Sequence, residues 1–250
     1  MRKILVTNDD GIMADGIIRL ARAAKEFGEV WVVAPKEQRS AASHSITLHT
    51  HIDIYPQEFP VEGVHAFACS GMPADCVRVG CRMLVPQGPD LVLSGINYGY
   101  NSASDLQYSA TAGAAFEAVF LGIPGIALSE GADPYYKGTS PCHEAADAFL
   151  RDILAELVTK PYLPGRIWNV NFPFCPLSEC KGVLWDRKVS ASSFFYDRYV
   201  KTEDLPNGGI RCRVEGIYNE EGEEGTDFMA LVNNFVSVGL VQNLSTGRDI

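Results

Sequence analysis

The sequence has no long run of apolar residues. No stretch approaches the roughly 18 residues that a membrane-spanning helix needs. The first apolar segment, Ile4-Leu5-Val6, is too short for the core of a signal peptide, and acidic residues follow it closely. We therefore expect a cytoplasmic protein without a membrane partner.

Positive charge is also scarce. The chain has 21 lysine and arginine residues against 31 aspartate and glutamate residues, which gives a formal net charge of −10 at pH 7. A general nucleic-acid-binding surface needs a basic face, so we expect no stable nucleic-acid partner. An anionic substrate would have to be attracted locally, by a bound cation or by backbone amides.

Several catalytic signatures are missing. The seven cysteines include no Cys-x-x-Cys pair, and there is no Gly-x-Ser-x-Gly motif of the kind that carries the nucleophile of serine hydrolases. Cys76 and Arg82 do have the Cys-x5-Arg spacing of thiol phosphatases. That chemistry needs the cysteine in a loop of converging amides before a helix. Cys76 instead lies inside a predicted helix, which disfavours this class.

Strand and helix patterns alternate through residues 1–172. Apolar runs predict strands at 3–7, 29–34, 64–69, 90–94, 123–129 and 167–172, with a more exposed strand at 44–54. Amphipathic or alanine-rich segments predict helices at 16–27, 73–84, 111–121 and 143–158. This alternation predicts an α/β fold, with a Rossmann-like, mostly parallel sheet flanked by helices, and a catalytic core over residues 1–172.

The pattern changes after Pro173. Strand-like segments at 182–189, 194–200 and 210–218, with the turn sequence Asn207-Gly208-Gly209, predict β-hairpins. An acidic loop follows at 219–225, and residues 228–244 either return to the sheet or form an exposed arm. We expect residues 173–250 to be a C-terminal hairpin extension that supports oligomerisation, because protruding hairpins can pair with a second copy.

Four polar clusters follow strands or precede a helix in the predicted core. They are Asn8-Asp9-Asp10-Gly11, Gln38-Arg39-Ser40, the loop 95–101 around Asn97, and the segment 108–113 at the start of the alanine-rich helix. Ligands of parallel α/β sheets bind outside the carboxyl ends of the strands. We therefore expect all four clusters to gather at one edge of the sheet.

The first three clusters offer a set of oxygen ligands. Two adjacent carboxylates, Asp9 and Asp10, are costly at the end of a buried strand unless a cation lies between them. The Ser40 hydroxyl and the Asn97 amide oxygen would add neutral ligands. Such a set suits Mg²⁺ or Mn²⁺ and leaves positions for water and a phosphate oxygen.

The fourth cluster suits an anion. Ser109 and Thr111 come with the free backbone amides that begin a helix, and this arrangement favours a phosphate group. Together the clusters predict a metal-dependent phosphatase.

Several segments resemble the SurE family of nucleotidases. They are VTNDDG, APKEQRSAASHSIT, SGMPADCV, LVLSGINYGYN, YSATAGAAFEA and GIPGIALS, followed more loosely by NVNFP and EGTDFMALVNNFVSVGL. The resemblance implies a Rossmann-like phosphohydrolase that acts on nucleoside 5′- and 3′-monophosphates, with one divalent metal ion per subunit. It also implies a homodimer or homotetramer formed through C-terminal arms.

The resemblance also implies roles for individual residues. The metal ligands would be Asp9, Asp10, Ser40 and Asn97. Asn8, Ser109 and Thr111 would lie close to the phosphate, so the implied catalytic group is Asn8, Asp9, Asp10, Ser109 and Thr111. Which group acts as general base is left open.

Two features depart from the family pattern. Ala110 stands where the family usually has glycine, and its methyl group would restrict the approach of the backbone to the phosphate. Tyr98 and Tyr100 flank Gly99 and either stack on a nucleobase or only pack on the loop; Tyr98 is included among the predicted substrate contacts. The alternative functions are a phosphatase of other monoesters or polyphosphate, and a non-catalytic nucleotide or metal sensor.

Overall fold

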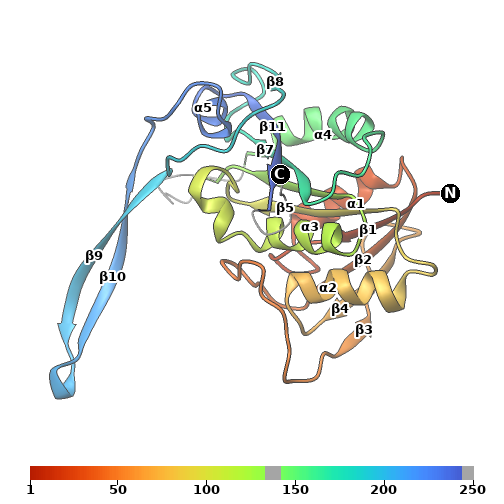
Figure 1. Ribbon diagram of the computed structural model, residues 1–250, viewed down its shortest axis with the longest axis horizontal. Helices are drawn as coiled ribbons and strands as arrows, with labels where there is room; N and C mark the ends of the chain where they lie inside the picture. The colour runs from red at the N-terminus through yellow and green to blue at the C-terminus, as the bar shows by residue number, and fades with distance from the viewer. Residues whose placement is uncertain (133–141, 244–250) are drawn as a thin grey trace.

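The computed structural model of the chain describes residues 1–132 and 142–243. Its centre is a nine-stranded sheet in the order β3-β4-β2-β1-β5-β6-β7-β11-β8 (Figure 1). The strands are β1 (Lys3–Thr7), β2 (Glu29–Pro35), β3 (Ile54–Pro56), β4 (His65–Cys69), β5 (Leu91–Tyr98), β6 (Gly125–Glu130), β7 (Arg166–Phe172), β8 (Val183–Leu184) and β11 (Val236–Gln242). Neighbouring strands from β4 to β7 run parallel, whereas β3 and β11 pair antiparallel with β4 and β7. The predicted α/β, mostly parallel sheet is confirmed.

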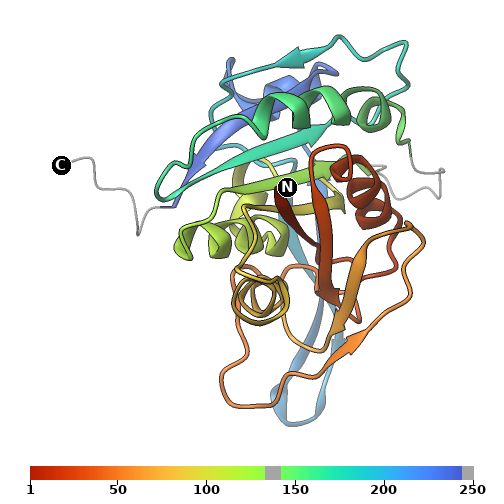
Figure 2. The same ribbon diagram turned by 90° about the vertical axis from the view of Figure 1, so that its right-hand side faces the viewer.

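Helices cover both faces of this sheet (Figure 2). The first face carries α1 (Asp15–Ala24) and α4 (Glu144–Leu157). The second carries α2 (Pro73–Val79), which continues into a π-helical turn at Gly80–Leu84, and α3 (Ala110–Phe120). Successive side chains of a strand point to opposite faces, so Ile4 and Val6 pack in the core under α1, whereas Leu5 packs with α2 and α3.

The order of the strands creates a switch point between β1 and β5. The chain runs from β1 outward through β2 and β4, then returns to the other side of β1 as β5 and continues through β6 to β7. In open α/β sheets the ligand crevice lies at this reversal, outside the carboxyl ends of the strands. Residues that follow β1 and those that end β5 are therefore the ones placed for chemistry.

Two details of the predicted core are wrong. Residues 44–53 form no strand, and only Ile54–Pro56 pairs, with β4. The polar groups of this segment bind elsewhere, because the backbone N–H of Thr47 donates to the Asp75 carboxylate and that of Asp53 donates to the Ser70 hydroxyl. The strand predicted at 90–94 runs on to Tyr98, with irregular pairing between Ser94 and Asn97.

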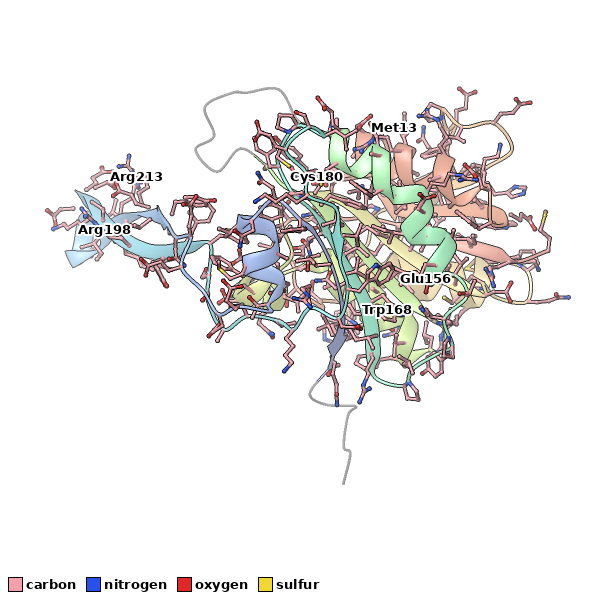
Figure 3. All side chains as sticks on the ribbon, turned by 90° about the horizontal axis from the view of Figure 1, so that it is seen from above. Met13, Glu156, Trp168, Cys180, Arg198 and Arg213 are labelled. Carbon is pink, nitrogen blue, oxygen red and sulfur yellow. The ribbon has the colours of Figure 1, made fainter. Side chains whose placement is uncertain are left out.

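The C-terminal part divides between the sheet and a projecting arm. Strands β9 (Phe195–Asp204) and β10 (Ile210–Tyr218) form an antiparallel hairpin, closed by a 3₁₀ turn at Pro206–Gly208. This hairpin extends away from the body (Figures 1 and 3). The segment after it returns to the sheet as α5 (Asp227–Val232) and β11.

The segment predicted as a strand at 182–189 does not form a hairpin. Its short strand β8 instead runs parallel to β11 at the edge of the sheet. The sheet thus takes strands from both sides of Pro173, and the division into two domains stays a prediction. Residues 244–250 lie outside the described part of the chain.

Within the described residues, no helix combines the length and the apolar character that would be needed to cross a membrane.

Candidate active site

Asp9 lies just beyond β1 and is almost completely buried, with 4% of its surface exposed. The Thr111 hydroxyl donates a hydrogen bond of 2.6 Å to its carboxylate. The backbone N–H of Arg39 donates to the Asp9 carbonyl at 2.7 Å. Burial raises the pKa of Asp9 to about 6; the hydrogen bond from Thr111 opposes this shift, and the neighbouring charge of Asp10 adds to it. Burial thus destabilises the ionised form of the Asp9 carboxyl group.

Asp10 is half-buried and faces the two other strand ends. The side-chain amide of Gln38 donates to one carboxylate oxygen at 3.2 Å, and the backbone N–H of Tyr98 donates to the other at 3.1 Å. Burial raises the pKa of Asp10, while these two hydrogen bonds lower it. The acidic pair therefore contacts each of the other three predicted clusters: Gln38 after β2, Tyr98 at the end of β5, and Thr111 in α3.

The two neutral ligands predicted for the metal lie in the same region. The side-chain amide of Asn97 donates to the carbonyl of Gly99 at 2.8 Å, and among the described residues nothing donates to its oxygen. The nitrogen of Asn97 is thus used within the segment itself, and the role of its oxygen as a metal ligand stays a prediction. Ser40 is exposed in the loop after β2, directly beside Arg39, whose backbone is bonded to Asp9.

Each of the three predicted phosphate contacts, Asn8, Ser109 and Thr111, already makes a hydrogen bond within the protein. The Ser109 hydroxyl caps α3 by accepting from the N–H of Ala112 at 2.9 Å, and its proton is still available to a ligand. The Thr111 proton is already given to Asp9, so Thr111 acts on the site through Asp9. The Asn8 amide donates to the Gly11 carbonyl at 2.8 Å, and its buried oxygen has no partner among the described residues.

Tyr98 behaves differently from the expectation for a stacking residue. Its side chain is 43% exposed, and the residue contacts the site through its backbone N–H, which donates to Asp10. The neighbouring Tyr100 points inward instead, where its hydroxyl accepts from the N–H of Phe174 at 2.7 Å. A role of the Tyr98 side chain in substrate binding stays a prediction.

Two helix glycines allow the segments of the site to meet, and sequence reasoning did not single them out. A Cβ on Gly16 would lie 2.0 Å from the carbonyl oxygen of Ile96, so α1 contacts the backbone beside Asn97 directly. A Cβ on Gly113 would lie 2.6 Å from the carbonyl oxygen of Ser43, so α3 packs against the loop that follows Ser40. A glycine inside a helical pattern is the signal that points to such a close approach.

A buried amide network anchors the loop after β5. The backbone N–H of Asn101 donates to the Asn171 side chain at 2.8 Å, and the Asn101 side chain donates to Ser129 at 2.8 Å. The side chains of Asn169 and Asn171 in turn donate to the Asn101 carbonyl. Two asparagines on a buried strand are the sequence signal for this network, which holds the segment after β5 against β6 and β7.

The donor set fits a hard divalent cation. No basic side chain among the described residues forms an ion pair with Asp9 or Asp10, although both are at least half-buried. The described residues contain no group of three or more His, Cys, Asp or Glu side chains that could hold a metal ion. Two carboxylates with neutral hydroxyl and amide oxygens are instead the ligand types that Mg²⁺ and Mn²⁺ accept.

The structure argues against a thiol phosphatase. Cys76 lies within α2 and is completely buried, and burial raises the pKa of its thiol well above the ordinary value. A nucleophilic cysteine needs the opposite, a lowered pKa and access to substrate.

Fold and site together define a Rossmann-like α/β protein with an acidic, oxygen-rich site at the switch point of its sheet. The sequence model of the family described as "Survival protein SurE" matches residues 4–193. The chain belongs to the SurE family.

Relatives of known name match nearly the whole chain. A 5′-nucleotidase SurE of Mesorhizobium japonicum is 37% identical over 250 residues, which cover 99% of this chain and 96% of that protein. A 5′-nucleotidase SurE of Rubrobacter xylanophilus is 39% identical over 248 residues, which cover 94% of this chain and 89% of that protein. The crystal structure of the SurE protein from Aquifex aeolicus matches with a TM-score of 0.80 and 32% identity, and covers 97% of this chain and 94% of that one.

Proposed function

We propose that the protein is a divalent-metal-dependent phosphohydrolase that removes phosphate from nucleoside 5′- and 3′-monophosphates. The observation that carries the proposal is the Asp9–Asp10 pair, which contacts Gln38, Tyr98 and Thr111 from three separate segments at the switch point. The names of the curated relatives, 5′-nucleotidases, support the nucleotide substrate.

One Mg²⁺ or Mn²⁺ ion per subunit would be held by Asp9, Asp10, Ser40 and Asn97. When bound, such an ion supplies charge neutralisation at the phosphoryl group and lowers the pKa of a water molecule. Asp9 is held in its orientation by the Thr111 hydroxyl, and Asp10 by the Tyr98 backbone. These hydrogen bonds fix both carboxylates before any ligand arrives, so less order has to be created on binding.

The start of α3 would receive the phosphate. The first N–H groups of a helix have no partner within it, and they attract anions together with the helix dipole. Ser109 caps this helix and keeps its hydroxyl proton for a phosphate oxygen. A preorganised donor of this kind lowers the barrier by roughly 3 kcal/mol. Ala110, the first residue of α3, is completely buried at this point.

The direct test measures inorganic phosphate released from a panel of nucleoside 5′- and 3′-monophosphates, with Mg²⁺, with Mn²⁺ and with EDTA. The proposal predicts release that depends on the metal and stops in EDTA. Polyphosphate and a simple monoester such as glycerol phosphate belong in the same panel. A clear preference for polyphosphate or for glycerol phosphate would replace nucleotides as the proposed substrate class. Nucleotide binding without any phosphate release would identify a sensor.

We also propose that the β9–β10 arm binds a second copy of this chain, which gives a homodimer or homotetramer. The arm stands clear of the body, as the labelled Arg198 and Arg213 show in Figure 3. It exposes apolar side chains on both faces, namely Tyr196, Tyr199, Val214 and Ile217, each more than half exposed. An isolated two-stranded hairpin is marginal in water, and apolar side chains on both faces favour burial by a partner.

The oligomeric state tests this proposal. Light scattering after size exclusion should give a dimer or tetramer mass for the unmodified chain and a monomer mass for the double variant Tyr199→Ser/Val214→Ser. These two residues are directly paired across the hairpin. The variant Thr202→Ser, in the same arm, is the control. A monomeric unmodified chain would contradict the proposal.

A further inference from the structure

A cavity of about 330 Å³ lies beside the segment that follows β5, between that segment and the base of the arm. Gly99 and Tyr100 form its wall on the side of the active site, and the aromatic residues Phe174, Phe194, Phe195 and Tyr218 line it as well. Gly99 is two residues from Asn97, a distance of at most about 7 Å along the chain. The cavity therefore lies next to the part of the chain that carries Asn97, one of the proposed metal ligands.

The aromatic wall is formed in advance. The Tyr100 ring stacks on Phe194 with ring centres 5.0 Å apart, and Phe194 packs on Phe228 at 4.4 Å. The hydroxyl of Tyr100 is tied to the backbone of Phe174. A Cβ on Gly131 would lie 2.5 Å from the Tyr100 ring, so the glycine there makes room for the ring. Rigid aromatic surfaces of this kind bind flat rings at small entropic cost.

The polar side of the cavity accepts hydrogen bonds. Asp105 lines it from the 3₁₀ helix Ala103–Gln107, and its side chain is half-buried. Among the described residues none donates a hydrogen bond to this carboxylate. Burial raises the pKa of Asp105, and the nearby charge of Asp197 adds to the shift. A second carboxylate, Glu220, lines the same space.

These surroundings suit a ligand that is flat and carries N–H donors. An ionised carboxylate only accepts hydrogen bonds, so Asp105 and Glu220 call for donors on the ligand. Guanine offers a ring N–H and an amino group side by side, which match the two oxygens of one carboxylate. Uracil has a single ring N–H and no amino group.

We propose that this cavity binds the base of the nucleotide and that Asp105 selects for guanine over uracil. The inference rests on the proposed nucleotidase function and names the part of the protein that recognises the base. The ring stacks against the aromatic wall, Asp105 accepts from the base edge, and the phosphate reaches Asp9 and Asp10 past Gly99. Base-on-aromatic stacking contributes to binding for every base, so the preference among bases comes from the carboxylate.

The test compares GMP, UMP and ribose 5-phosphate, which has no base. In the unmodified enzyme, kcat/KM should fall in that order. In Asp105→Asn, the ratio of kcat/KM for GMP to that for ribose 5-phosphate should fall about tenfold or more, because the amide offers one acceptor in place of two and no charge. Asp197→Asn is the matched control: it removes a nearby carboxylate that does not line the cavity, and the ratio should not fall.

A uniform loss for all three substrates would mean that Asp105 has only a structural role, and it would overturn the proposal. So would an unchanged ratio of GMP to UMP in Asp105→Asn.

If no substrate releases phosphate, the proposed catalytic function fails, and the cavity is tested separately by calorimetry with guanosine and uridine. Binding of guanosine that Asp105→Asn weakens would support the base site. Absence of binding by both nucleosides would overturn it.

Discussion

The hydroxyl of Thr111 donates a hydrogen bond of 2.6 Å to the carboxylate of Asp9, and this contact joins the first turn of α3 to the end of β1. Both side chains are buried. The bond links the two halves of the candidate site, because Asp9 belongs to the predicted metal ligands and α3 begins at the predicted phosphate cradle. Thr111 is thus a positioning residue for Asp9.

Thr111→Val should keep the shape of the side chain and remove this bond. Hydrogen bonds to charged groups contribute about 1.5–3 kcal/mol, so kcat/KM should fall by about tenfold or more. The apparent affinity for Mn²⁺ should weaken as well, because Asp9 is no longer held. Thr111→Ser restores the hydroxyl and should recover most of both losses. Equal losses in the serine and valine variants would show that only packing is involved.

Asp9→Asn should stabilise the metal-free protein while it removes activity. The pKa of Asp9 is about 6 in the fold against 3.8 in a model peptide, so the folded state binds the proton more tightly. Between these two pH values the free energy of unfolding of the metal-free protein falls as pH rises. By pH 7 the ionised Asp9 lowers the free energy of unfolding of the metal-free protein by about 3 kcal/mol.

Urea unfolding in EDTA at pH 5 and pH 7.5 checks this prediction. The gain in stability from Asp9→Asn should be larger at pH 7.5 than at pH 5. Asp53→Asn, at an exposed position outside the site, should show no such difference. A variant that is less stable than the unmodified chain at pH 7.5 would contradict the account of this charge.

Gly113→Ala should destabilise the protein, although the same change inside a helix usually stabilises it by up to about 1 kcal/mol. The added Cβ would lie 2.6 Å from the Ser43 carbonyl and 2.9 Å from the His44 Cα, both of which are backbone atoms. The loop that carries Ser40 would have to shift. A thermal melt gives the sign directly, and a raised melting temperature would show that α3 and the loop are less closely packed than described.

Arg19→Met should destabilise the protein by up to about 3 kcal/mol, because it removes the arginine that pairs with the buried Glu130 and leaves His143 as the remaining partner of that carboxylate among the described residues. Arg19 contacts the Glu130 carboxylate at 2.9 Å, and the side chain of Glu130 is only 3% exposed. His143 also contacts Glu130, at 2.9 Å. Urea unfolding of the single variant and of Arg19→Met/Glu130→Gln separates the effects. The double variant should recover part of the stability that Arg19→Met loses, because no buried charge is left. A double variant that is even less stable than Arg19→Met would contradict a stabilising pair between Arg19 and Glu130.

The sequence predicts the sheet and the edge that carries the site. Buried strands such as 3–7 are bounded by clear turn and helix signals, and the position of polar residues after them follows from the geometry of parallel sheets. The contacts between the acidic pair and the other clusters agree with that reasoning. Ser40 lies in the loop expected, whereas Asn97 lies near the end of β5, which runs on further than predicted; the ligand roles of both stay predictions.

Other features depend on contacts that no local pattern contains. Residues 44–53 alternate like a strand but pair with no strand, because backbone N–H groups of this segment donate to the side chains of Asp75 and Ser70 instead. Tyr98 and Tyr100 look equivalent beside Gly99, yet only Tyr100 points into the aromatic cluster, because Phe194 and Phe174 arrive there from distant parts of the chain. Similarly, the partner of β8 is β11, a strand about 50 residues further along the chain, so no local pattern predicts this pairing.

Metal-dependent hydrolysis at Asp9 is tested most directly by phosphate release from GMP. Release is measured for the unmodified protein and for Asp9→Asn, in Mn²⁺, after EDTA, and after Mn²⁺ is added back. Asp53→Asn serves as the matched control. In the unmodified and control proteins, EDTA should abolish release and Mn²⁺ should restore it, and a folded Asp9→Asn should lack most of the activity. Near-normal release by Asp9→Asn, or release that EDTA does not affect, would contradict it.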